Sequence, residues 1–458
     1  SSRRRHTRCS RDWSSDVCSS DLPFWAWAAG GWFSVFPTTL WAFALLSAVN
    51  AAIGLLGTYA LAGSFLERDH RLSAVTLLLL TPFYTLLAFK YNANTIFLSL
   101  WPWTAFFLVR SIENKDARYA VGFGVLAALD MLSKYYAVLL LATCLWAALL
   151  HPQRERYFRS KAPYLAVGAG LLLLTPHFLW LFNTGFLPFA YFESEAGNSL
   201  RYALMQVGNV FLQSVLPQLT IPIAMFAGRA EMRMVSVHIP WADARFRVLL
   251  VLALAPIFLT LVTAVMFRVK LTSNTTAAIF CLTPALFLAA QTPIDASLRR
   301  RFLRWSCLLS LASLLASPAL AYGHALKWFG GTPNINQPCE ELADAVTQEW
   351  HQFAGAKLNI VAGTEVYADG VTFYSVDHPS SFIAFDTRKA PWVNPDRIRR
   401  EGMLIVCASS DTNCHTSAAS FDASNVKKVT LTLQHHYFQI AGKPAQFNLY
   451  LVPPKRDR

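Results

Sequence analysis

The feature that most constrains this chain is a succession of long apolar runs before residue 330. A helix that crosses a bilayer needs about 20 mostly apolar residues, and ten runs approach that length. They cover residues 40–63, 72–89, 94–110, 118–132, 135–150, 163–183, 205–227, 248–267, 276–292 and 305–323. The composition agrees, because 54% of the 458 residues are hydrophobic and only 15% are charged. The sequence therefore predicts a polytopic α-helical membrane protein and excludes an ordinary soluble enzyme.

The basic residues of the loops fall into two alternating sets. One set of loops holds 17 Lys and Arg residues, and the other holds only 5, namely Lys90, Lys134, Arg201, Arg268 and Lys270. Since cytoplasmic loops are enriched in Lys and Arg, we expect the richer set to face the cytoplasm. The outer side then receives residues 22–39, 90–93, 133–134, 184–204, 268–275 and the whole C-terminal region. This bias explains the net charge of +13, so no nucleic-acid partner is expected.

Residues 1–21 differ in composition from everything that follows. They are rich in Arg, Ser and Asp and lack the apolar stretch of a signal peptide. The segment resembles translated sequencing-adapter read-through, and we interpret it as non-native; a disordered basic arm is the alternative. The expected domains are therefore this segment, a transmembrane domain over 22–330 and a further domain over 331–458.

The C-terminal region changes to short apolar runs separated by turn residues. Five runs are expected to be strands, at 358–363, 371–376, 402–409, 426–434 and 447–453. Residues 339–355 have helical periodicity and end at a glycine. We expect a small extracytoplasmic α/β domain. Cys407 and Cys414 lie close in sequence on the expected oxidising side, so a disulfide between them and two free thiols are both open.

Polar residues near the expected outer face are candidates for substrate binding, because charge near a membrane is expensive and tends to mark function. Lys134 offers an ammonium group for a phosphate, but it also lies four residues from Asp130 on one helix and could pair with it. Lys90 and Asn94 could recognise a polar ligand, or be a snorkelling lysine and a helix cap. Arg268 and Lys270 could hold an anionic headgroup.

Four further residues complete the set of candidates. Tyr135 is an expected interface residue beside Lys134, and His177 follows a proline near the outer end of its span. Glu193 and Glu195 are the acidic residues of the outer loops, and either could be a base or simply a solvated carboxylate. No Cys and His spacing matches a zinc site, and a divalent metal is the one cofactor that stays open.

The order of several motifs resembles that of the GT-C glycosyltransferases, specifically family 39, which includes protein mannosyltransferases and lipid A aminoarabinose transferases. The motifs in the membrane part are LPFWAWAAGGWFSVFP (22–37), NANTIFLSLWPWTAFFLVRSIE (92–113), LSKYYAVLLL (132–141) and PHFLWLFNTGFLPFAYF (176–192). Two more follow near the C-terminus, VAGTEVYADGVTFYSVDHPS (361–380) and PWVNPDRIRREGMLIVC (391–407).

The resemblance implies transfer of a sugar from a polyprenyl-phosphate donor to a glycan, lipid or protein acceptor, by inverting displacement on the extracytoplasmic side. Family members use an Asp in the first outer loop as general base, and basic residues stabilise the departing lipid phosphate. Here that loop is expected to be incomplete, and Asn94 stands where many relatives have Asp. Glu193, Glu195 and Asp130 are weak candidates for the base. We therefore expect an N-terminally truncated, inactive chain from an active parent enzyme.

Two other classes of function remain open. A transporter or flippase for lipid-linked saccharides would suit many spans and an outer basic rim, although no internal repeat is evident. A non-enzymatic membrane sensor would also present a terminal domain outside. The expected location in each case is a bacterial inner membrane, with the C-terminal domain in the periplasm.

Overall fold

The computed structural model describes most of the chain after residue 21. The described residues are 22–81, 83–85, 90–114, 116–186, 189, 199–221, 239–268, 273–290, 297, eleven positions between 300 and 316, 337–387, 390, 392–421, 426–437, 440–441 and 443–455. They form two compact units. One, here called the helical unit, contains residues 22–25 and 43–313, and the other contains 26–42 and 314–458.

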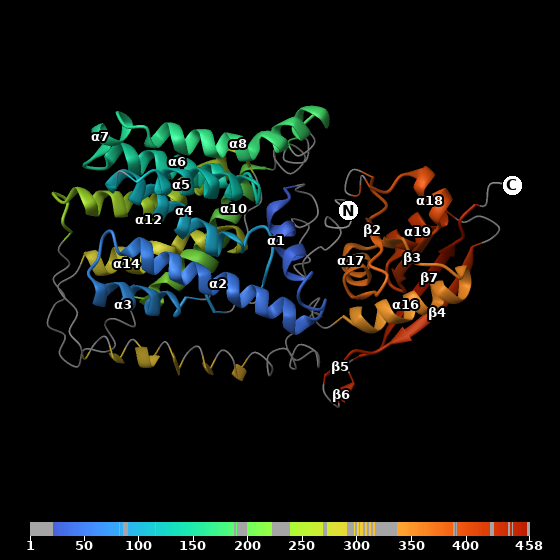
Figure 1. The fold of residues 1–458 in the computed structure, drawn as a ribbon. Helices are drawn as coiled ribbons and strands as arrows, with labels where there is room; N and C mark the ends of the chain where they lie inside the picture. The colour runs from blue at the N-terminus through green and yellow to red at the C-terminus, as the bar shows by residue number, and fades with distance from the viewer. Residues whose placement is uncertain are drawn as a thin grey trace. The chain divides into compact units, whose positions relative to one another are not determined.

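Apolar helices build the helical unit (Figure 1). The N-terminal helices are α1 (Phe24–Trp32), most of which belongs to the other unit, α2 (Leu40–Ala62), which enters the helical unit at Phe43, α3 (Arg68–Leu78), α4 (Phe97–Glu113), α5 (Ala117–Met131) and α6 (Ala137–Leu150). Next come α7 (Arg154–Phe158), α8 (Ala162–Asn183), α10 (Leu200–Val210) with the turns Phe211–Val215 and Leu216–Leu219, α12 (Ala244–Phe267), α13 (Ser273–Thr276), Ala277–Leu282 and α14 (Thr283–Ala289). The predicted fold class, a polytopic helical membrane protein with a small C-terminal α/β domain, is confirmed.

The number of full-length spans differs from the expected ten. Among the described residues, three helices are long and apolar enough to cross a membrane, namely α2, α8 and α12. The other described runs do form helices, but α4, α5 and α6 have only 17, 15 and 14 residues. At 1.5 Å per residue, a helix the length of α5 extends about 22 Å, which is less than a hydrocarbon core of about 30 Å. The run at 305–323 lies largely outside the described residues.

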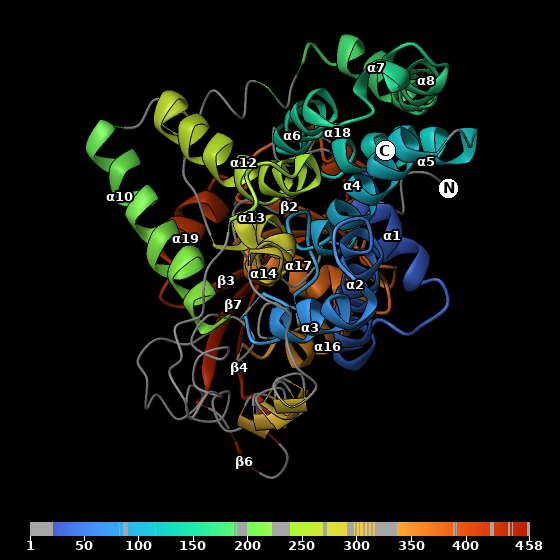
Figure 2. The same cartoon turned by 90° about the vertical axis from the view of Figure 1, so that its left-hand side faces the viewer.

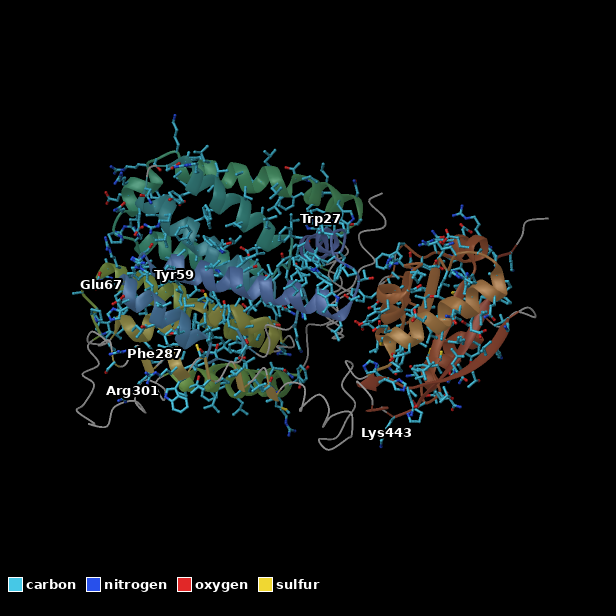
Figure 3. The ribbon with its side chains drawn as sticks, turned by 60° about the horizontal axis from the view of Figure 1, so that its bottom comes forward. Trp27, Tyr59, Glu67, Phe287, Arg301 and Lys443 are labelled. Carbon is cyan, nitrogen blue, oxygen red and sulfur yellow. A yellow bond between two sulfur atoms is a disulfide. The ribbon has the colours of Figure 1, made fainter. Side chains whose placement is uncertain are left out.

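The loops that were expected to face the cytoplasm meet at one end of the helical unit. Residues 65–70, 240–249 and 288–289 line one cavity of about 250 Å³, and residues 150–159 share another with the first turn of α12. Glu67 and Arg301 lie toward this same end (Figure 3), and Figure 2 views the molecule from this end. The grouping of these loops is what the Lys and Arg count requires.

A close helix contact joins α5 to α8 in the helical unit. A Cβ atom on Gly124 would lie 2.0 Å from the backbone oxygen of Ala166, so only glycine allows the two backbones to approach this far. Small residues at helix interfaces have this role in membrane proteins, where close packing replaces the hydrophobic effect as a driving force.

We predict that Gly124→Ala destabilises the helical unit by about 1–3 kcal/mol, because the added methyl group forces the helices apart. The matched control is Gly168→Ala on α8, where a Cβ atom would meet nothing within 4 Å. Thermal unfolding of the detergent-solubilised protein measures the difference. A midpoint for Gly124→Ala equal to that of the control would contradict this account of the contact.

The C-terminal region forms a five-stranded mixed sheet with helices on it (Figure 1). Its elements are α16 (Cys339–Ala354), β1 (Ile360–Gly363), α17 (Glu365–Tyr374), β2 (Ser380–Ile383), α18 (Pro395–Glu401), β3 (Met403–Ala408), α19 (Thr412–Ala419), β4 (Lys427–Leu433) and β7 (Ala445–Val452). A separate hairpin pairs β5 (His436–Tyr437) with β6 (Ile440–Ala441). The order in the sheet is β2-β1-β3-β7-β4, with β1 parallel to β2 and β3, and β7 antiparallel to its neighbours.

One predicted strand of this domain is wrong. Residues 371–376, expected to be a strand, mostly form the second half of α17. Residues 368–373 are all buried, so this segment shows no polar face, and a short apolar run cannot distinguish a buried helix from a strand. The strand β2 was missed because Ser380–Ile383 has only four residues and opens with two serines. The helix α16 ends as predicted, with Gly355 in the left-handed conformation at φ 61°.

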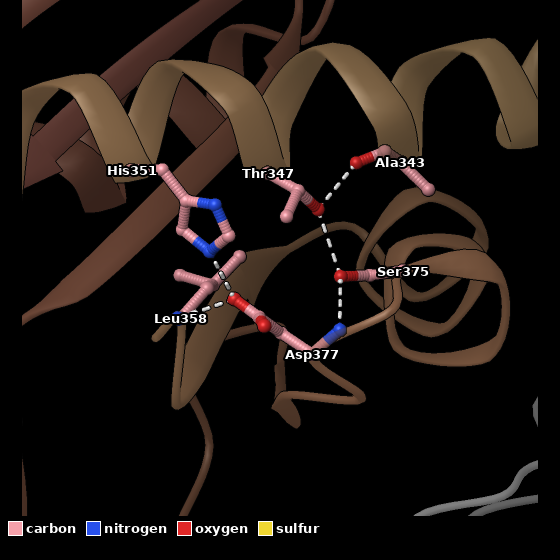
Figure 4. Close-up of polar contacts among 6 residues, drawn as sticks. All are labelled: Ala343, Thr347, His351, Leu358, Ser375 and Asp377. Atoms are coloured by element: carbon pink, nitrogen blue, oxygen red, sulfur yellow. Dashed lines mark hydrogen bonds and ion pairs between the residues drawn. The ribbon is translucent and has the colours of Figure 1, made fainter. Parts of the chain in front are cut away.

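A polar network fixes α16 to the segment between α17 and β2 (Figure 4). One carboxylate oxygen of Asp377 lies 2.7 Å from Nε2 of His351 and accepts a 2.7 Å bond from the buried backbone N–H of Leu358. The hydroxyls of Thr347 and Ser375 lie 2.7 Å apart, and the Ser375 hydroxyl accepts from the Asp377 N–H at 3.1 Å. Asp377 therefore satisfies backbone and side-chain donors together.

We predict that Asp377→Ala destabilises this domain by about 1–3 kcal/mol, because it leaves the buried Leu358 N–H without its acceptor. Asp396→Ala is the control, because Asp396 pairs with Arg399 at the surface and its side chain is 74% exposed. Exposed ion pairs contribute about 0–1 kcal/mol. Limited proteolysis of the whole protein across a temperature series reports the stability of this domain, and equal resistance of the two variants would refute the role of Asp377.

Candidate substrate site at the turn between α5 and α6

The turn at residues 132–136 brings several predicted site residues together. It follows the end of α5 at Met131 and precedes α6, which begins at Ala137. Its backbone is fixed at both sides, because the N–H groups of Ser133 and Lys134 donate to the Asp130 carbonyl at 3.0 and 3.1 Å. The Leu132 carbonyl accepts from the Phe24 N–H, which ties the start of α1 to this turn.

Lys134 is half-buried and donates from Nζ to Oδ1 of Asn94 at 2.9 Å. Asn94 itself is buried at 3% exposure and lies just before α4. The side chain of Asn92 orders this approach to α4, since its Oδ1 accepts from the N–H groups of Asn94 and Thr95 at 2.8 and 2.9 Å. A lysine ammonium is therefore held at a helix entrance with an amide oxygen as its partner.

The two tyrosines of the turn contact two other helices. The Tyr135 hydroxyl lies 2.8 Å from Nε2 of His177 on α8, and its ring stacks on Phe189 at a centroid distance of 5.3 Å. The Tyr136 hydroxyl lies 2.6 Å from that of Thr260 on α12. The turn thus connects the start of α1 and the entrance to α4 with α8 and α12, and it collects an ammonium, two phenols and an imidazole.

Of the two interpretations left open for Lys134, the structure does not form the pairing with Asp130. Asp130 is fully buried, and one of its oxygens accepts a 2.5 Å bond from the Thr104 hydroxyl on α4. Asp130 is therefore a buried contact between α4 and α5. Sequence spacing alone suggested the pair because it gives the separation of two residues but not the direction of their side chains.

The remaining candidates lie apart from the turn or outside the described residues. Lys90 is half-buried and precedes the Asn92 turn by two residues. Arg268 is exposed and caps α12 in the left-handed conformation, with φ 52°. It follows Thr260 by eight residues, about 12 Å along a helix axis. Lys270, Glu193 and Glu195 lie outside the described residues.

Several polar residues near the site were missed in the sequence. Asn50 on α2 donates to the Thr95 carbonyl at 2.7 Å and accepts from the Ser99 hydroxyl at 2.6 Å. Thr260 likewise contacts the turn that supplies Lys134, through the hydroxyl of Tyr136. Asn50 and Thr260 both interrupt apolar runs, and a polar residue inside such a run is the signal that could have indicated them. Among the described residues, no three His, Cys, Asp or Glu side chains group as a metal site.

A second polar contact lies at the carboxyl ends of β1 and β3 in the C-terminal domain. Thr364 follows β1 and donates from its hydroxyl to Asp411 at 2.5 Å, and Asp411 caps α19 by accepting from the Cys414 N–H. A disulfide joins Cys414 to Cys407 of β3. The hydrogen bond from Thr364, together with the backbone donors of α19, lowers the pKa of Asp411.

This lowered pKa leads to a prediction about acid stability. A carboxyl whose pKa is depressed in the folded protein stabilises it above the unfolded-state pKa, and this contribution is lost as the pH falls below about 4. Thr364→Val removes the largest cause of the shift, so its midpoint of acid unfolding should move toward that of Asp411→Asn. Tryptophan fluorescence against pH measures both. Identical acid midpoints for Thr364→Val and the unchanged protein would refute the coupling.

The fold and the site define the class of this protein as a polytopic membrane protein with a half-buried lysine in a polar turn and an appended α/β domain. Residues 20–180, about a third of the chain, match the family model described as dolichyl-phosphate-mannose-protein mannosyltransferase. This match confirms the resemblance to the GT-C glycosyltransferases at the level of the superfamily. No curated protein matches the sequence.

Solved structures with a similar arrangement come from two organisms. Two are crystal structures of ArnT from Cupriavidus metallidurans. The apo state has 14% identity and a TM-score of 0.47, with 97% of this chain and 92% of that chain covered. The form bound to undecaprenyl phosphate has 13% identity and a TM-score of 0.47, with 97% and 93% covered. The third is the Archaeoglobus fulgidus oligosaccharyltransferase in complex with Zn and sulfate, with 13% identity, a TM-score of 0.46 and 84% and 59% covered.

Proposed function

We propose that this protein belongs to an enzyme system that transfers a sugar from a polyprenyl-phosphate donor, and that the turn at 132–136 binds the donor's phosphate. The observation that supports this most directly is the Lys134 ammonium, half-buried at a helix entrance and held 2.9 Å from the Asn94 amide oxygen. The match of residues 20–180 to a family model for dolichyl-phosphate-dependent mannosyltransferases agrees with a lipid-phosphate donor.

The chemistry of the cluster suits the departing end of such a donor. When the sugar leaves, negative charge develops on the lipid phosphate, and a preorganised cation lowers the energy of that state. Lys134 supplies the charge, and the hydroxyl of Tyr135 supplies a neutral donor on the same turn when Nε2 of His177 carries the proton and donates to the phenol oxygen. Asn94 positions the lysine through its side-chain oxygen, so the ammonium does not need to reorganise during the reaction.

The resemblance to the GT-C glycosyltransferases of family 39 suggests the finer features of this function. They are an inverting displacement, membership of family 39, an acceptor that is a glycan, lipid or protein, and a place in a bacterial inner membrane with the C-terminal domain outside. The base is expected to be a carboxylate. The outer-loop residues Glu193 and Glu195 remain candidates for it, and Arg268 and Lys270 remain candidates for additional phosphate contacts.

We predict that Lys134→Gln weakens binding of undecaprenyl phosphate about tenfold or more, because a hydrogen bond to a charged group contributes about 1.5–3 kcal/mol. Glutamine keeps a donor for Asn94 while removing the charge. The control is Lys161→Gln, just before α8 at the other end of that helix from His177. Binding to the purified protein in nanodiscs is measured by native mass spectrometry.

Sugar transfer provides the second measurement in a full-length relative with the same turn. The unchanged enzyme should form a product in which the sugar is linked to an acceptor. The rate of this transfer should fall about a hundredfold when the lysine is replaced by glutamine. Equal donor binding by the two glutamine variants would refute the phosphate site. Movement of the labelled donor across the bilayer without a linked product would instead favour the transporter alternative.

A further inference from the structure

A cleft rich in arginine lies beside the segment that follows α6, whereas the turn at 132–136 precedes that helix. It has a volume of about 620 Å³ and lies between α7 and the first turn of α12. Its charged lining is Arg154, Arg156, Arg159, Arg247 and Glu155, with His151 beside them. Four guanidinium groups therefore face one carboxylate, and a cleft with this balance attracts an anion.

The arginines of this cleft are not neutralised within the described residues. Arg154 donates to the Leu149 carbonyl at 3.3 Å and Arg247 to the Trp241 carbonyl at 3.0 Å, and none of the four forms an ion pair with a described side chain. Carbonyl oxygens orient a guanidinium without removing its charge, and each group has further N–H donors that can bind oxygen atoms of a phosphate.

An apolar groove adjoins the cleft on the other side of α7. It has a volume of about 360 Å³ and lies between α5, α6 and α8. Small residues line part of it, among them Gly124, Ala128 and Gly170, and so do Leu145 and Val167, which are 56% and 60% exposed. The groove is therefore open along the side of the unit that the bilayer is expected to cover.

The short helix α7 belongs to both features. Tyr157 and Phe158 line the apolar groove, whereas Arg154, Arg156 and Arg159 line the cleft. A ligand that fills both must have an anionic group joined to a hydrocarbon chain. Phospholipids have this chemistry, and the basic loops at this end are those expected on the cytoplasmic side, where anionic lipids are enriched.

We propose that a phospholipid with an anionic headgroup binds here, with its phosphate in the arginine cleft and an acyl chain in the groove between α5, α6 and α8. This site is separate from the donor site at the turn of 132–136, so either can be wrong without affecting the other. A free phosphate would use the cleft alone, because it has no part that the apolar groove can receive.

The test compares lipid binding by the full chain in nanodiscs of phosphatidylcholine with and without phosphatidylglycerol, followed by native mass spectrometry. Arg156→Gln with Arg159→Gln should weaken phosphatidylglycerol binding about tenfold or more, since a hydrogen bond to a charged group contributes about 1.5–3 kcal/mol and these side chains line the cleft. Binding of phosphatidylcholine should change little. Val167→Trp, which fills the groove from an exposed position, should weaken binding of both lipids.

The control removes the same charge from the same end of the unit. Arg300→Gln with Arg301→Gln should leave phosphatidylglycerol binding unchanged, and size-exclusion profiles establish that every variant is folded. Undiminished phosphatidylglycerol binding in the Arg156 and Arg159 variant would overturn the proposal. Displacement of the lipid by inorganic phosphate at equal concentration, with no effect of Val167→Trp, would overturn the lipid assignment and leave a site for a free anion.

Discussion

The bond from Lys134 to Asn94 is the interaction on which the arrangement of the candidate site depends. Placing a lysine near the hydrocarbon boundary costs free energy unless oxygen atoms accept hydrogen bonds from its ammonium group. The turn that supplies this lysine also bonds α1 through a backbone carbonyl, and α8 and α12 through two tyrosine hydroxyls. One five-residue segment thereby sets the positions of residues from four other parts of the sequence.

The helical unit separates two kinds of polar surface. The turn at 132–136 concentrates a few polar groups, each with a defined partner, which suits a site for one ligand. The loops around α7 and the start of α12 contain more arginine and fewer partners. An excess of arginine in loops on one side sets the orientation of a protein in the membrane. The cleft and the groove around α7 also give this end a shape that a lipid can occupy.

The sequence predicted the parts of this fold that depend on local pattern. The runs that became α2, α8 and α12 were identified because their apolar length exceeds what a soluble helix needs. Cys407 and Cys414 were identified as possible partners by spacing, and the structure joins them. Residues 371–376 were misread because residues 368–373 are all buried, and a run of buried residues shows no polar face that would reveal a helical period.

The candidate site was predictable only in part, because spacing along the chain does not show which side chains meet. Lys134, Asn94, Tyr135 and His177 were each identified as polar residues near an expected membrane boundary, but nothing in their spacing showed that they meet. Of the two interpretations left open for Lys134, the pairing with Asp130 was not formed, because Asp130 contacts Thr104 on α4 and Lys134 contacts Asn94. Contacts between helices depend on which face each helix presents, and that orientation is not encoded in separation along the chain.

The sequence by itself predicted helices apolar enough to cross a membrane, an uneven distribution of Lys and Arg between the loops, and a change to an α/β pattern in the C-terminal region. These properties follow from hydrophobicity and charge, which are sums over neighbouring residues. Only the tertiary structure decided that Asn94 receives the Lys134 ammonium, that Asp130 is buried as a helix contact and that α7 divides a basic cleft from an apolar groove. These depend on distances between residues far apart in the chain, which packing alone sets.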